Sequence, residues 1–159
     1  MDFLKKLLPK VTAQAHCDVP CGIYDPTPAK IAVKTVQRMI NQINELIPPP
    51  PADAKAMDHY FNDLVRRVTT KEEHAQICKK ELLILWSDYF KPEHLEKYPD
   101  LHDKFWKATK LCSACKQDVD EEKANQLVSA VDQIAEIFYQ TKNDPRRFES
   151  YKDVTDKLF

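Results

Sequence analysis

Glycine is nearly absent from this chain: Gly22 is the only one among 159 residues. Tight β-hairpin turns depend on glycine, so a sheet built from hairpins is disfavoured. No stretch alternates polar and apolar residues for long, and no apolar run approaches the ~18 residues that span a bilayer. These absences predict an all-α protein without a membrane partner.

An excess of charge of either sign is also missing, because 24 Lys and Arg residues accompany 25 Asp and Glu residues. Without a basic stripe to neutralise phosphates, nucleic acid is not an expected partner. The five cysteines are an odd number, so they cannot all pair within the chain. A domain of this length forms a core without disulfides. We therefore expect reduced thiols and a cytoplasmic location, with a plastid left open.

Apolar residues recur three or four positions apart in four stretches between residues 27 and 142, the spacing of bundle helices. This pattern predicts an antiparallel up-down-up-down four-helix bundle. The four seams are Val33, Val36, Ile40, Ile43 and Ile47; Phe61, Leu64, Val68, Ala75, Cys78, Leu82, Leu85 and Tyr89; Leu101, Phe105, Ala108, Cys112, Cys115 and Val119; and Leu127, Val131, Ile134 and Phe138.

The ends of these stretches carry helix signals. Thr27 is placed to cap the first helix, with Pro28 at its first position. A capping-box pattern at residues 69–73 leaves open whether the second stretch is one helix or two. Lys71 is the only polar residue on the second seam. Asp144 and Pro145 break the pattern, so residues 143–159 are expected to be a charged tail of unknown role, with a short extra helix left open.

Residues 16–26, HCDVPCGIYDP, combine metal ligands with turn formers and resemble nothing else in the chain. Gly22 takes positive φ at little cost, and the prolines on either side fix φ near its usual value. The segment is therefore predicted to be a compact, irregular hook that precedes the bundle.

Residues 1–15 end in Ala13-Gln14-Ala15, which has the A-x-A form of a leader-peptidase site. A secretory signal also needs an apolar region of ~7–15 residues, and lysines interrupt every candidate here. We interpret the segment as a removable leader that is not a standard export signal. The alternative is an amphipathic first helical turn that the mature protein keeps.

Cleavage after Ala15 would give His16 a free α-amine. That amine, the deprotonated amide nitrogen of Cys17 and the thiolates of Cys17 and Cys21 can form a square plane. Two nitrogens and two soft sulfurs in a plane suit nickel(II) or copper(II) better than zinc. The His16 imidazole is placed to become an axial fifth ligand. A Cys17–Cys21 disulfide or a plain turn remains the alternative.

The other three cysteines are expected to be structural. Cys112 and Cys115 form a C-x-x-C pair, but both fall on the third helical seam and no second ligand pair follows at zinc-site spacing. Cys78 falls on the second seam. Since a free cysteine behaves as a small buried hydrophobe, all three are predicted to pack in the core.

Three segments of the chain carry a resemblance to a known family. The hook sequence HCDVPCGIYDP resembles the nickel hook of the nickel-containing superoxide dismutases. Residues 85–92, LWSDYFKP, with the nearby Glu96-Lys97-Tyr98-Pro99, are similar to the second signature of that family, and residues 137–142 to its last helix. The resemblance covers residues 16–142.

The resemblance implies conversion of superoxide to oxygen and hydrogen peroxide by nickel(II)/nickel(III) cycling. It implies one nickel ion per subunit, a homohexamer and a leader-processing peptidase as partner. Carried over by position, His16 supplies the amine and the axial imidazole, Cys17 its amide nitrogen and thiolate, and Cys21 the second thiolate.

Four further positions follow from the same resemblance. Tyr24 and Tyr89 match paired tyrosines that flank the open face of the metal, where they limit anion access and order water. Asp18 and Pro20 match positions that shape the hook. Asp18 is grouped with the two tyrosines as a candidate catalytic residue.

Two positions depart from the family pattern. Ala32 stands where well-known members have a glutamate that hydrogen-bonds the axial imidazole, and His74 stands where they have its arginine partner. Because a ligand histidine normally needs a partner that fixes its orientation, we hypothesise that His74 approaches the hook and takes over part of this role.

Two other functions are compatible with the residues. The first is a non-catalytic nickel or copper carrier, which uses the same hook but does not need Tyr24 or Tyr89. The second is a helical interaction module in which the hook is a disulfide-closed loop.

Overall fold

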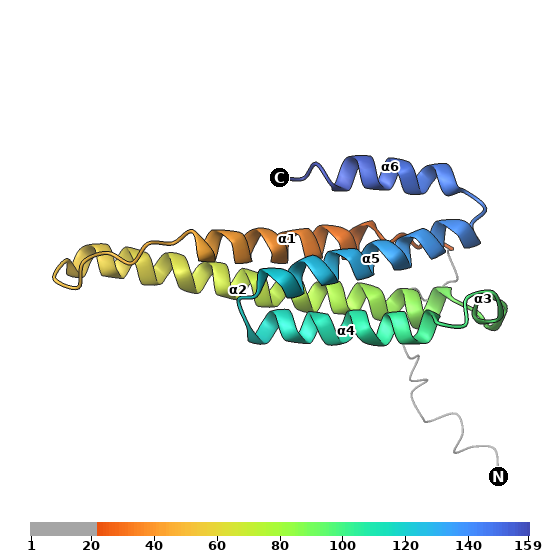
Figure 1. The fold of residues 1–159 in the computed structure, drawn as a ribbon, viewed down its shortest axis with the longest axis horizontal. Coiled ribbons are helices and arrows are strands. Elements are labelled where there is room, and N and C mark those ends of the chain that lie inside the picture. The colour runs from red at the N-terminus through yellow and green to blue at the C-terminus, as the bar shows by residue number, and fades with distance from the viewer. Residues whose placement is uncertain (1–21) are drawn as a thin grey trace, which may run out of the picture.

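The computed structural model describes residues 22–159, and every regular element in that part of the chain is a helix. Four long helices make up the bundle: α1 (Thr27–Asn44), α2 (Ala54–Ile84), α4 (Leu101–Gln117) and α5 (Glu121–Thr141). Helix α1 packs against α2, α2 against α4 and α4 against α5, and α5 returns to α1 (Figure 1). The predicted four-helix bundle is confirmed.

Three shorter helices complete the described chain. The π-helical turn η2 (Leu85–Tyr89) continues α2 directly, and the amide of Phe90 donates to the carbonyl of Leu85 at 3.1 Å. Helix α3 (Pro92–Lys97) forms the turn into α4, and α6 (Pro145–Thr155) follows α5. The second stretch of the sequence is therefore one helix, with a change of pitch at its end.

The predicted seams supply most of the core. Val33, Ile40, Phe105 and Leu127 are among the fully buried side chains. Cys78, Cys112 and Cys115 are also buried as free thiols, which confirms the prediction that they pack in the core. Burial raises the pKa of Cys115 to about 11, so this thiol stays protonated at neutral pH.

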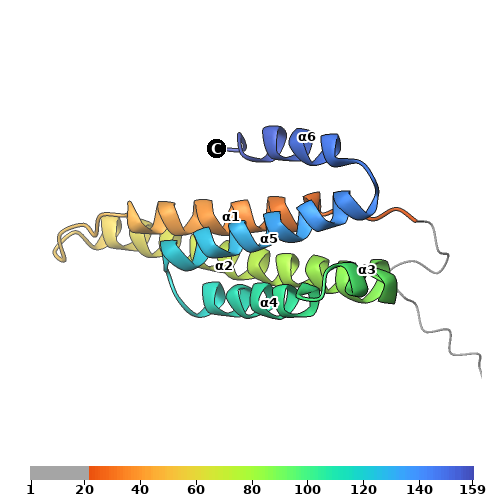
Figure 2. The same ribbon diagram turned by 45° about the vertical axis from the view of Figure 1, so that its right-hand side comes forward.

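Two seam residues are exposed, and their predicted burial was wrong. Ile47 is 85 % exposed because α1 ends at Asn44. Phe61 is 51 % exposed. The first turns of α2 extend beyond α4 and α5 (Figures 1 and 2), so neither of these two helices covers them. The sequence pattern gives the helical face but not the length of the neighbouring helices.

The buried Lys71 has a specific role in the bundle. Its ammonium donates to the carbonyl oxygens of Cys115 at 2.6 Å, Lys116 at 2.9 Å and Asp118 at 3.0 Å. These carbonyls belong to the C-terminal end of α4, where helical partners run out. The one polar residue on the second seam therefore caps a neighbouring helix.

Most of the tail at residues 143–159 forms the short helix α6, which lies along the outside of α5 and α1 (Figure 2). The Asp144 carboxylate accepts from the Arg147 amide at 3.3 Å and so caps this helix. Tyr151 and Thr155 are buried. Among the described helices, none combines the length and the apolar character that a membrane crossing requires.

Candidate metal centre

The predicted donors His16, Cys17 and Cys21, with Asp18 and Pro20, lie outside the described residues. The structure begins at Gly22, immediately after them, and therefore locates the point where the hook joins the bundle. Within residues 22–159, no three His, Cys, Asp or Glu side chains gather as ligands for a metal ion.

Gly22 adopts the conformation that its lack of a side chain permits. Its φ is 69°, in the left-handed region, and a Cβ added there would meet no atom of residues 22–159 within 4 Å. The requirement for glycine is therefore conformational rather than a matter of space. Gly22 therefore takes the positive φ that the sequence led us to expect.

Asp25 anchors the segment that leads from the hook into α1. Its carboxylate accepts from the Thr27 amide at 2.8 Å and from the Thr27 hydroxyl. The same carboxylate accepts from the Tyr139 hydroxyl at 3.2 Å. The prediction that Thr27 caps α1 was wrong, because Thr27 is the first helical residue and the oxygen that satisfies its amide comes from Asp25.

The structure brings together Tyr24 and Tyr89, which are far apart in the sequence. Their ring centroids are 5.6 Å apart, with an angle of 53° between the planes. Tyr24 lies near the C-terminal end of the hook, and Tyr89 is held by the last turn of η2. Their pairing is what a shared role beside one metal ion would require.

The two tyrosines line a cavity of about 410 Å³. Its other lining residues are Gly22, Asp88, Lys91, His94, Thr141 and Lys142. The Lys142 ammonium lies 4.9 Å from the centroid of the Tyr89 ring. The cavity therefore meets the hook at Gly22 and Tyr24, and it carries two lysines against one aspartate.

Tyr89 is held in a single protonation state and orientation. Its hydroxyl lies 2.6 Å from the Thr141 hydroxyl, which in turn donates to the Phe138 carbonyl at 2.6 Å. Because the Thr141 proton is used there, Tyr89 is the donor in the first bond. Burial raises the pKa of Tyr89, and the hydrogen bond to Thr141 opposes this only in part. Tyr89 is therefore a neutral phenol at physiological pH.

His94 is a part of this environment that the sequence did not assign to the site. Its ring stacks on Tyr89 with centroids 5.7 Å apart, and its Nδ1 accepts from the Lys91 amide at 3.1 Å. The neutral ring therefore carries its proton on Nε2. The one sequence feature that could have pointed to His94 is its position two residues after Pro92, in the first turn of a short helix.

Ala32 and His74, the two departures from the family pattern, lie on adjacent helices α1 and α2. Ala32 is buried. The Nδ1 atom of His74 is also buried and has no hydrogen-bond partner among residues 22–159. Because buried polar atoms are nearly always paired, the lack of a partner for this nitrogen among residues 22–159 is unusual.

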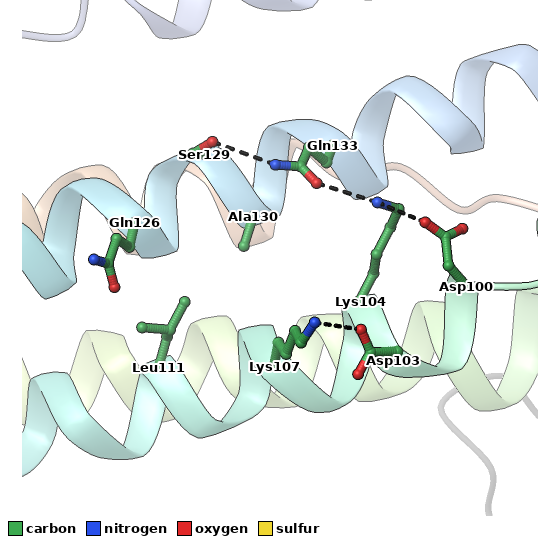
Figure 3. A pocket seen from close by; sticks show the side chains of 9 residues that line it. All are labelled: Asp100, Asp103, Lys104, Lys107, Leu111, Gln126, Ser129, Ala130 and Gln133. Carbon is green, nitrogen blue, oxygen red and sulfur yellow. Dashed lines mark hydrogen bonds and ion pairs between the residues drawn. The ribbon is translucent and has the colours of Figure 1, made fainter.

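A second cavity, of about 390 Å³, lies between α4 and α5, away from the tyrosine pair (Figure 3). Its charged side chains all lie on the α4 side and pair along that helix: Lys104 contacts Asp100 at 3.0 Å, and Lys107 contacts Asp103 at 2.6 Å. These charges are thus already neutralised on the wall, and the cavity shows no catalytic grouping.

The sequence model of the family described as nickel-containing superoxide dismutase matches residues 11–142. The chain belongs to this family. The match includes the hook and both tyrosines, and it ends before α6. Curated superoxide dismutases [Ni] from Streptomyces seoulensis and Streptomyces coelicolor are each 38 % identical over 134 residues, which cover 84 % of this chain and 93 % of the relative.

The fold agrees with this membership. A native structure of a nickel superoxide dismutase matches with a TM-score of 0.69 and 34 % sequence identity. The match covers 80 % of this chain and 99 % of the other. The nickel family thus accounts for the bundle as well as for the hook sequence.

Proposed function

We propose that this chain is a superoxide dismutase, in which nickel bound by His16, Cys17 and Cys21 disproportionates superoxide to oxygen and hydrogen peroxide. Membership of the family supports the activity, and the donor residues lie within the matched range. The observation that carries the proposal is the contact of Tyr24 with Tyr89 at the point where the hook enters the bundle.

The donor set fits nickel. A free amine, a deprotonated amide and two thiolates favour a planar divalent ion and a soft-ligand environment. When bound, nickel supplies one-electron transfer in both directions between its +2 and +3 states. The amine exists only if the chain is cut after Ala15, so we also propose that residues 1–15 are a leader and that a peptidase partner removes it.

The described residues have distinct tasks around that site. Tyr24 and Tyr89 narrow the approach to the hook, and this favours a small anion over larger molecules. The Tyr89 hydroxyl is fixed on Thr141, so its oxygen offers a lone pair to a water molecule in the cavity. Lys91 and Lys142 give the cavity positive charge, which attracts superoxide at long range.

His74 remains our candidate for support of the His16 ring. Its buried Nδ1, which has no partner among residues 22–159, is suited to accept or donate one hydrogen bond to a group from the hook. Asp18 and Pro20 would then shape the hook so that this contact forms. We expect His74→Ala to lower nickel affinity and to alter the nickel(III) spectrum, whereas His59→Ala, on the same helix, should change neither.

The homohexamer and the cytoplasmic location are part of the same proposal. Exposed apolar side chains on α2, among them Phe61 and Val65, support contacts between subunits. The three free, buried thiols are consistent with a reducing compartment. Equilibrium sedimentation of the processed chain should give six times the monomer mass.

The test of the function uses a chain that begins at His16, is loaded with nickel and is assayed for superoxide loss. Cys21→Ser is the control, because it removes one thiolate and keeps the hook length. We expect rapid dismutation that the control lacks. Bound nickel without dismutation would instead support the carrier, and full activity of Cys21→Ser would refute the assigned donors.

A further inference from the structure

Helix α6 is the part of the described chain that the family match leaves out, since that match ends at residue 142. The helix lies along α5 and α1 on the outside of the bundle (Figures 1 and 2). Two sets of contacts hold it there, one ionic and one aromatic.

The ionic set joins three helices. The Lys30 ammonium of α1, which is fully buried, lies 2.7 Å from Asp132 of α5 and 3.0 Å from Asp156 at the end of α6. Lys152 of α6 contacts the same two carboxylates at 2.7 and 2.9 Å. Because loss of one partner would leave a buried charge, this network fixes α6 firmly against the bundle.

The aromatic set leads from α6 toward the hook. Tyr139 of α5 is buried and contacts Phe148 and Tyr151 of α6, with ring centroids 6.4 and 5.8 Å away. Its hydroxyl donates to Asp25 at 3.2 Å. Burial, together with the negative charge of Asp25, raises the pKa of Tyr139 to about 12. The phenol therefore stays protonated and keeps donating.

Helix α6 also contacts Asp25 directly. The Arg147 guanidinium lies 3.5 Å from the Asp25 carboxylate and 6.0 Å from the centroid of the Tyr139 ring. The other Asp25 oxygen accepts from the Thr27 amide. One carboxylate thus connects the entry to α1 with α5 and α6.

We propose that α6 is a brace for the C-terminal end of the nickel hook. Through Tyr139 and Arg147 it holds Asp25 in place, a short distance along the chain from the donor Cys21. The inference rests on the proposed function, because only a metal-binding hook gives the brace a consequence. A chelating loop whose end is already fixed loses less conformational entropy when it closes on a metal. Tyr139 and Arg147 are therefore positioning residues that raise nickel affinity without touching the ion.

The test compares four chains that begin at His16: the unaltered chain, Tyr139→Phe, Arg147→Gln and the chain that ends at Asn143. Arg146→Gln is the matched control, since Arg146 is an exposed arginine of the same helix. For each chain, the nickel dissociation constant is measured by competition with a chelator. The nickel(III) electron paramagnetic resonance spectrum and the thermal midpoint of the bundle are recorded alongside.

We expect Tyr139→Phe to weaken nickel binding about tenfold, the low end of what the loss of one hydrogen bond to a charged group implies, and to broaden the nickel(III) spectrum. Arg147→Gln should weaken binding about twofold because this ion pair is exposed. The chain without α6 should show the largest loss, and Arg146→Gln none. The two point variants keep α6, so they still test whether α6 raises nickel affinity if the shortened chain does not fold.

Nickel affinity and spectra that stay unchanged in Tyr139→Phe and Arg147→Gln would overturn the brace. A lowered thermal midpoint with unchanged nickel binding would do the same, because α6 would then be purely structural. If the unaltered chain itself neither bound nickel nor dismutated superoxide, the proposed function would fail instead.

Discussion

Replacement of Lys71 by methionine tests how the backbone carbonyl groups at the C-terminal end of α4 obtain hydrogen bonds. Methionine keeps most of the apolar stem and removes the ammonium, which donates to three carbonyl oxygens between 2.6 and 3.0 Å. Hydrogen bonds to a charged group contribute ~1.5–3 kcal/mol each, and relief of the buried charge returns several kcal/mol. The net loss of unfolding free energy should be about 2–4 kcal/mol.

Urea unfolding followed by far-ultraviolet circular dichroism, at one protein concentration, measures this loss. With a slope of ~2 kcal/mol/M, the midpoint should fall by about 1–2 M. Lys79→Met is the matched control, because the Lys79 ammonium makes one 3.0 Å bond to the Ser113 hydroxyl. This bond is only partly buried, so its loss should cost at most about 1 kcal/mol. Equal midpoints for the two variants would refute the capping role of Lys71.

Three further predictions concern the site and α6. Tyr89→Phe removes the bond to Thr141 and should lower superoxide turnover several-fold with nickel still bound; unchanged turnover would exclude a role for this hydroxyl. Gly22→Ala places a side chain at φ 69°, at a cost of about 1–2 kcal/mol, and should weaken nickel binding roughly tenfold in chelator competition. Lys152 and Lys30 hold the pKa of Asp156 below its usual range although burial acts in the opposite direction, so the stability that Asp156 contributes is present above pH ~4 and lost on acidification below it. Near-ultraviolet circular dichroism should then report release of α6; an Asp156→Asn chain that responds identically to acid would contradict this.

The sequence predicted the helical faces well, because burial of a 3.6-residue stripe is a local property. It did not predict that Phe61 would be exposed, since that depends on where α4 ends and α5 begins in space. The π turn at residues 85–89 was also missed. One additional residue in a single helical turn does not change the spacing of the apolar residues visibly, yet it changes the direction in which Tyr89 leaves the helix.

The candidate site was partly readable from the sequence. The hook ligands came from the chemistry of residues 16–21 and from the family resemblance, and the Tyr24–Tyr89 pair came from the resemblance alone. The contact between the two tyrosines is now seen in the structure. The contacts of Asp25 were not readable, because its partners Tyr139 and Arg147 lie more than a hundred residues away and on helices with no shared pattern. Long-range polar contacts of this kind depend on packing that only the fold supplies.

The central claim is that the hook becomes active when His16 acquires a free amine. Its most direct test is the superoxide turnover of two nickel-treated chains, one that begins at His16 and one that keeps Ala15 in front of it. The account predicts rapid turnover and tightly bound nickel for the first chain, and neither for the second. Equal turnover by the chain that keeps Ala15 would contradict it.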